Sequence, residues 1–98
     1  MKIFISQYMG NRDAEEIKTE RQFIVDALES KGHTVIDTLL DLGDVSPVIY
    51  LGESIKLLAE ADAIYLMPGW EQGRGCRIEK QVAEEYNIPI YNEDKEEN

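Results

Sequence analysis

Apolar positions along this chain fall into two kinds of pattern. Short runs rich in β-branched and aromatic residues occur four times, and the stretches between them include segments with the three-to-four-residue spacing of a helix. Alternation of strand and helix predicts right-handed crossovers and a parallel sheet covered on both faces. The predicted strands are residues 2–6, 33–37, 62–67 and 88–92, and the predicted helices are residues 13–31, 52–61 and 75–87.

The segment at residues 38–50 has no clear period and contains Gly43 and Pro47, so it is predicted to be a long loop that could include a helical turn. Residues 1–92 then form one α/β domain, and residues 93–98 form an acidic, solvated tail. We expect a small three-layer, flavodoxin-like or Rossmann-like parallel sheet of about four strands. A sheet of this kind in so short a chain favours a homodimer or higher homo-oligomer, with a neighbouring chain near the loop.

Polar residues and glycines gather after the predicted strands. In open parallel sheets, ligands bind beyond the carboxyl ends of the strands. His33 and Asp62 begin their strands, so they are expected at the opposite end. The residues expected at the ligand-binding end are Ser6, Gln7, Tyr8, Met9 and Gly10 after the first strand, Asp37 after the second, the segment from Gly69 to Gly75 with Trp70 after the third, and Asn92 after the fourth.

Glu79 places a carboxylate on the apolar face of the last predicted helix. At about 100° per residue it falls within the arc formed by Ile78, Val82, Ala83 and Tyr86. One interpretation is a boundary glutamate whose carboxylate reaches solvent. The other is a functional carboxylate beside the ligand-binding end of the sheet, where burial would raise its pKa or require a partner.

Arg21 raises the same question on the first predicted helix, because it lies on the same arc as Ile17, Val25 and Leu28. Its stem could pack while its guanidinium reaches solvent. Alternatively, it could be a cation that keeps Glu79 ionised or meets a phosphate.

Composition narrows the choice of partners and compartment. Ten basic against twenty acidic residues give a net charge of −10, which disfavours binding to duplex nucleic acid or an anionic membrane. No apolar stretch approaches the roughly 20 residues that span a bilayer, and the first apolar run is too short for a signal peptide. The single cysteine, Cys76, cannot form an intrachain disulfide and is expected to be buried. We therefore expect a cytoplasmic protein without a metal or cofactor.

Four segments together resemble a known family: "KIFISQYMG", "KGHTVID", "YLGESIKLLAEADAIYLMPGW" and "GRGCRIEKQVAEEYNIPI". They are similar to small, mostly uncharacterised bacterial and phage proteins grouped with the nucleoside 2-deoxyribosyltransferases, to which the deoxynucleoside monophosphate N-glycosidases are related. The resemblance covers nearly the whole chain. It implies a nucleoside or nucleotide as the small-molecule partner and cleavage or transfer at the N-glycosidic bond.

In those enzymes a glutamate that follows a glycine by four residues, on a helix after a central strand, attacks the anomeric carbon of the deoxyribose. Gly75 and Glu79 match that placement, so the resemblance implies that Glu79 is the nucleophile. The segment from Gln7 to Gly10 matches the loop that lines the nucleoside or phosphate site. The aspartate that handles the leaving base is replaced by Ser54, with Glu53 beside it, and a serine cannot supply the same proton.

Ser54, the basic Arg74 and Arg77 around the nucleophile segment, and a chain shorter than those enzymes leave a catalytically silent nucleotide-binding module as an alternative. A second alternative is an oligomeric interaction protein without ligand chemistry, whose acidic surface and oligomer interface are its function. Trp70 could stack on a base or fill a subunit interface. With Glu79 as the catalytic candidate, the substrate-binding candidates are Ser6, Gln7, Met9, Gly10, Arg21, Asp37, Ser54, Gly69, Trp70, Gly75 and Arg77.

Overall fold

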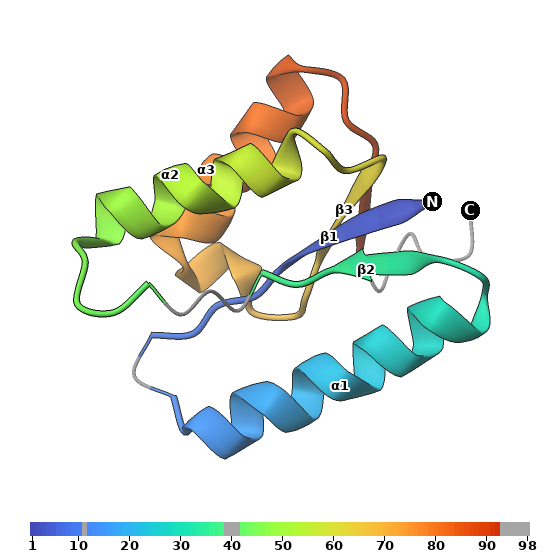
Figure 1. Cartoon of the computed structure of the whole chain (residues 1–98), viewed down its shortest axis with the longest axis horizontal. Coiled ribbons are helices and arrows are strands. Elements are labelled where there is room, and N and C mark those ends of the chain that lie inside the picture. Colours follow the sequence, from blue (N-terminus) through green and yellow to red (C-terminus); the bar gives the residue numbers. More distant parts are fainter. Residues whose placement is uncertain (11, 39–41, 93–98) are drawn as a thin grey trace.

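The computed structural model describes residues 1–10, 12–38 and 42–92, and it has the predicted α/β architecture. Within this part of the chain, four strands form one parallel sheet in the order β2-β1-β3-β4. Figure 1 shows α1 on one side of the sheet and α2 and α3 on the other. The elements in chain order are β1 (Lys2–Ser6), α1 (Ala14–Ser30), β2 (Thr34–Ile36), α2 (Pro47–Leu58), β3 (Ala63–Leu66), the short 3-10 helix η1 (Trp70–Gln72), α3 (Arg74–Glu85) and β4 (Ile90–Asn92).

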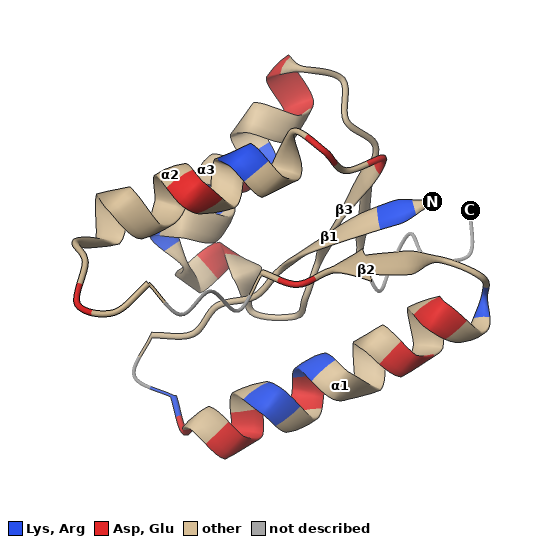
Figure 2. Ribbon diagram, viewed as in Figure 1, with Lys and Arg blue, Asp and Glu red and all other residues tan. Residues whose placement is uncertain are grey.

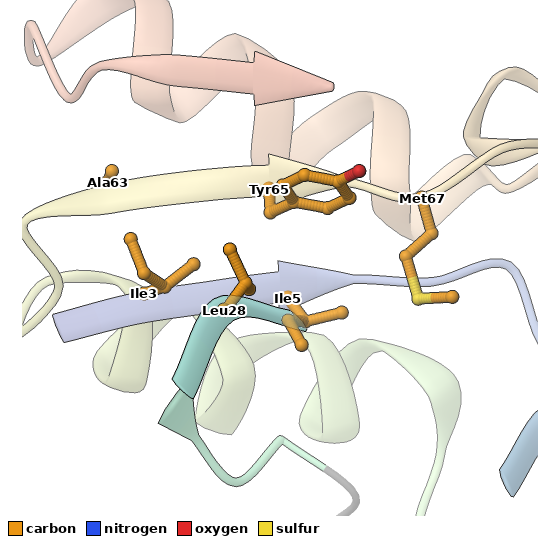
Figure 3. Close-up of a cluster of buried hydrophobic side chains, with 6 residues drawn as sticks. All are labelled: Ile3, Ile5, Leu28, Ala63, Tyr65 and Met67. Atoms are coloured by element: carbon orange, nitrogen blue, oxygen red, sulfur yellow. The ribbon is translucent and has the colours of Figure 1, made fainter. Parts of the chain in front are cut away.

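One apolar cluster joins α1 to the sheet (Figure 3). Alternate residues of β1 and β3 point to this face, as the two-residue period of a strand requires. Leu28 is the buried residue that α1 contributes, and Ile24 and Val25 pack around it. The buried members are Ile3, Ile5, Leu28, Ala63, Tyr65 and Met67.

A second cluster lies on the opposite face and joins the sheet to α2 and α3. Phe4 of β1 packs there with Leu58 of α2 and Ala83 of α3, and all three are at most 1% exposed. Ser6 follows Phe4 by two residues, so it points to this same face at the carboxyl end of β1. The alternation along β1 therefore directs a hydroxyl toward the layer that contains α3.

The prediction of a loop over residues 38–50 is wrong at its end, because α2 begins at Pro47. The Ser46 hydroxyl accepts a hydrogen bond from the Ile49 amide, and Pro47 occupies the first turn, where its missing amide hydrogen costs nothing. α2 also ends earlier than predicted, at Leu58. A serine cap followed by proline was thus the start of a helix.

The other predicted segments are confirmed with shifts of a few residues at their ends. Asp13 lies just outside α1 as its cap and accepts from the Glu15 amide, so the helix proper begins at Ala14. α3 begins one residue earlier than predicted, at Arg74, and ends at Glu85, two residues before Asn87 adopts a left-handed φ of 60°. Residues 39–41 of the predicted loop and the predicted acidic tail, 93–98, lie outside the described residues.

Acidic and basic residues both occur along each of the three α-helices, α1, α2 and α3 (Figure 2). In the described ranges, we find no helix of the length and apolar character that crossing a membrane requires.

Candidate functional site

A cavity of about 680 Å³ lies at the carboxyl end of the sheet. Its wall comes from three segments that are distant in sequence: residues 7–10 after β1, residues 46–51 around the start of α2, and residues 73–79 around the start of α3. Gln7, Met9, Gly10, Gly75 and Glu79 all line it. The parallel sheet therefore brings these predicted residues together where its strands end.

Glu79 is buried in this wall, with 8% of its surface exposed. The hydroxyl of Ser6 donates a hydrogen bond to Glu79 Oε1 at 2.6 Å. Burial raises the pKa of Glu79 to about 7, and the bond from Ser6 opposes that rise. Among the described residues, no cation forms an ion pair with this carboxylate. Glu79 is thus a buried carboxylate whose hydrogen-bond donor is the neutral hydroxyl of Ser6.

Cys76 lines the same cavity one turn before Glu79 and is buried, as predicted. Burial raises the pKa of its thiol, and a hydrogen bond with Ser6 acts in the opposite direction. The thiol is therefore predominantly protonated near neutral pH, and Ser6 contacts both it and Glu79.

Tyr8, which was expected at the ligand-binding end but not as a substrate-binding residue, forms part of the cavity wall. A Cβ atom at Gly10 would come within 2.9 Å of Tyr8 Cε1, and one at Gly73 would come within 3.1 Å of Tyr8 Cδ1. A side chain at either position would therefore press on the tyrosine ring, and the overlap would be greater at Gly10 than at Gly73. The pair of glycines in two loops was the available sequence signal for this contact.

Gln7 is 6% exposed, and its side-chain amide donates to the Ile17 carbonyl of α1 at 3.0 Å. Its Oε1 atom is buried and finds no donor within the described part of the chain. A buried acceptor without a donor is uncommon in folded proteins. The cavity wall therefore includes a residue, Gln7, whose side-chain oxygen has an unused capacity to accept a hydrogen bond.

The first turn of α3 also faces the cavity. Gly73 precedes the helix and supplies no side-chain cap, and Arg74, Gly75 and Cys76 follow it along the wall. The first backbone N–H groups of a helix have no partner inside the helix and favour an anion. A helix start and a basic residue, Arg74, therefore lie together in the cavity wall, although the chain as a whole is acidic.

The hypothesis that Arg21 pairs with Glu79 is wrong. Arg21 is buried on α1, on the opposite face of the sheet from α3, and its Nη2 donates to Thr38 Oγ1 at 2.6 Å. Asp37 lines a separate cleft beside Arg21 rather than the Glu79 cavity. The helical wheels correctly placed Arg21 and Glu79 on the core-facing sides of their helices. However, α1 and α3 pack on opposite faces of the sheet.

Four further candidates lie outside the Glu79 cavity. Ser54 is buried within α2, and Trp70 packs against the core cluster beneath α2 and α3, with Lys80 Nζ 5.6 Å from the centre of its ring. Arg77 donates to the Glu71 carbonyl at 2.7 Å. Gly69 lines a second cleft, which shares Tyr8 and Gly10 with the Glu79 cavity.

Residues that begin strands lie at the other end of the sheet, as predicted. The Lys2 amide donates to Asp62 at 2.7 Å, and the Met1 amine lies 3.3 Å from His33 Nδ1. Across the described ranges, no group of three or more histidine, cysteine, aspartate or glutamate side chains could hold a metal ion.

Comparisons with known proteins give a fold and a family. A solved structure described as a 2-deoxyribosyltransferase from the psychrotolerant bacterium Bacillus psychrosaccharolyticus superimposes with a TM-score of 0.71 at 16% sequence identity, covering 94% of this chain and 71% of that one. The resemblance predicted from the sequence is therefore confirmed at the level of the fold. No curated protein matches the sequence. The model of a domain of unknown function, DUF4406, matches residues 1–92, and the chain belongs to that family.

Proposed function

We propose that this protein cleaves or transfers the N-glycosidic bond of a deoxynucleoside or its 5′-monophosphate, with Glu79 as the nucleophile. The observation that carries the proposal is a buried carboxylate in a cavity at the carboxyl end of the sheet, held by Ser6 rather than by a cation of the described chain. The fold shared with a 2-deoxyribosyltransferase supports it.

In the proposed reaction, the Glu79 oxygen that Ser6 does not hold attacks the anomeric carbon of the sugar. The bond from sugar to base breaks as this bond forms, and its electron pair leaves on the base nitrogen, which takes up a proton. Water or a second base then attacks the same carbon and releases the carboxylate. A carboxylate suits this chemistry because positive charge develops on the sugar in the transition state.

The anion-favouring turn of α3 supports a monophosphate over an uncharged nucleoside. Uncapped N–H groups and Arg74 lie on the cavity wall, and a phosphate is well matched to such a helix start. The sugar would then lie between this turn and the loop that contains Gln7. Binding of a small anion at one point is compatible with the overall charge of −10.

One observation favours a second candidate, a silent nucleotide-binding module. The residue at the position of the leaving-group acid, Ser54, is buried within α2 away from the cavity. Its neighbour Glu53 is paired with Lys56 at 2.8 Å and does not line the cavity either. Proton transfer to the leaving base would then have to come from another group or from water.

The deciding experiment incubates the protein with each deoxynucleoside and each 5′-monophosphate and measures free base by chromatography. We expect release from at least one monophosphate, loss of release in Glu79→Gln, and normal release in Glu85→Gln, which removes an exposed carboxylate from the same helix. Thermal stabilisation by the same compounds measures binding separately. Stabilisation without release would establish the silent module, and no response to any compound would leave an interaction protein.

We also propose that the protein is a homo-oligomer. Val48 and Ile49 are apolar and exposed at the start of α2, beside the cavity. A second copy packed there would remove this surface from water and narrow the opening of the site.

We also propose a cytoplasmic location, because a reducing compartment would keep the thiol of Cys76, the single cysteine, in its free form.

A further inference from the structure

Arg21 is a buried charge that the proposed reaction does not use. It is 6% exposed, and burial lowers the pKa of its guanidinium, with the nearby Asp37 acting against this. Burying a cation is costly unless its donors are used. One donor, Nη2, makes a short hydrogen bond of 2.6 Å to the hydroxyl of Thr38.

Thr38 connects three parts of the fold. Its hydroxyl accepts from Arg21 and donates to the Ile5 carbonyl at 3.1 Å, which fixes the direction of its own hydrogen. Its backbone carbonyl accepts from the Tyr50 hydroxyl, also at 3.1 Å. Ile5 precedes Ser6, the residue that holds Glu79. These hydrogen bonds therefore run from the α1 layer, past the carboxyl ends of β2 and β1, to the α2 layer.

Tyr50 lies on the cavity wall, at the beginning of α2. The next residue, Leu51, approaches the start of α3 closely enough that a Cβ atom at Gly75 would lie 3.9 Å from Leu51 Cδ1. The placement of the first turns of α2 thus sets how closely the wall approaches Gly75 and Cys76, which lie opposite on α3. Tyr50 fixes that placement relative to the sheet by its bond to Thr38.

We infer that Arg21 is a positioning residue for the cavity wall: it holds Thr38 in the orientation in which Thr38 receives Tyr50, and so it keeps α2 closed over the start of α3. Arg21 would thus act across the sheet, because α1 packs on one face and the starts of α2 and α3, which form the cavity wall, pack on the other. This role goes beyond the proposed chemistry and does not depend on which ligand the cavity takes.

Cys76 provides a measurement that needs neither substrate nor turnover. It is the only cysteine of the chain, is 5% exposed and lies in the wall of the same cavity. Its rate of alkylation by iodoacetamide in native buffer reports how often the wall opens. The free energy of unfolding of each variant, from urea titration, gives the alkylation rate expected from global unfolding alone, so faster labelling measures local opening.

The experiment is a double-mutant cycle between Arg21→Met and Tyr50→Phe, with Lys18→Met as the control for an exposed cation on the same helix. Each of the first two variants should raise the alkylation rate by about tenfold, the factor expected for one lost hydrogen bond. Because both act through Thr38, the double variant should react no faster than the faster single variant. Lys18→Met should match the wild type.

Two substitutions at Thr38 give an independent result if Arg21→Met does not fold. Thr38→Val removes the hydroxyl and should raise the alkylation rate, while Thr38→Ser keeps the hydroxyl and should restore the wild-type rate. Unchanged labelling in Arg21→Met or Thr38→Val would overturn the inference. Effects of Arg21→Met and Tyr50→Phe that multiply in the double variant would also overturn it, because the two residues would then act separately.

Discussion

Replacing Glu79 by glutamine should make the protein more stable, and the gain should depend on pH. The pKa of Glu79 is about 7 in the fold, against an ordinary value of 4.5. The folded state therefore binds this proton more tightly than the unfolded chain, so the wild type loses stability as pH rises from about 4.5 to about 7. At roughly 1.4 kcal/mol per pKa unit, the loss amounts to about 3 kcal/mol above pH 7.

Glutamine keeps the oxygen that accepts from Ser6 but carries no charge, so the Glu79→Gln variant escapes this loss. Urea unfolding at pH 4.5 and pH 8, followed by the fluorescence of the single tryptophan, Trp70, would measure both proteins. We expect the variant to gain about 3 kcal/mol over the wild type between the two pH values. In thermal unfolding at pH 8, this corresponds to a melting temperature higher by roughly 10 °C or more.

Glu85→Gln is the matched control, because it changes an exposed carboxylate on the same helix and should show no comparable gain. A difference between Glu79→Gln and the wild type that stays constant with pH would refute the reasoning. So would a variant that is less stable at pH 8, since that would mean that a cation holds the carboxylate ionised.

Three other expectations follow from the site. Ser6→Ala removes the bond that opposes the effect of burial, so the pKa of Glu79 should rise further and the pH at which base release reaches half its maximum should move upward. Gly10→Ala places a methyl group against the ring of Tyr8, so ligand-induced thermal stabilisation should weaken, and an unchanged response would show that the ring moves freely. Light scattering at micromolar concentration should give the mass of a dimer or larger, and Val48→Asp should lower it; a wild-type monomer would contradict the proposed assembly.

The fold was predictable because each buried strand can be recognised from its own residues in the sequence. Strands buried on both faces of a parallel sheet read as short apolar runs, and β1 and β3 are such runs in the sequence. The start of α2 was missed because Gly43 and Pro47 were interpreted together as loop residues. Proline in the first turn of a helix and proline within a loop differ only in what precedes them, and here that residue is the capping Ser46.

The candidate site was predictable in part. Glu79 stood out because its position on the helical wheel conflicts with its charge, but its partner Ser6 is 73 residues away and no periodicity relates the two. Arg21 showed the same conflict and was placed in the wrong half of the core. Strand order would have separated them: the chain passes from β1 to β2 in one direction across the sheet and from β3 to β4 in the other, so right-handed crossovers place α1 and α3 on opposite faces.

The close packing of α3 against the sheet ties the reactive group to an apolar residue. Ala83 follows Glu79 by one helical turn, is fully buried, and packs in the cluster that contains Phe4. Its single methyl group lets α3 approach β1 closely, and the 2.6 Å bond between Ser6 and Glu79 is made across that same approach. A larger side chain at this position would displace the helix and lengthen the bond. If the site is catalytic, selection would therefore limit the size of Ala83, although this residue does not line the cavity. Part of the evolutionary constraint on the site would then act on the volume of a core side chain.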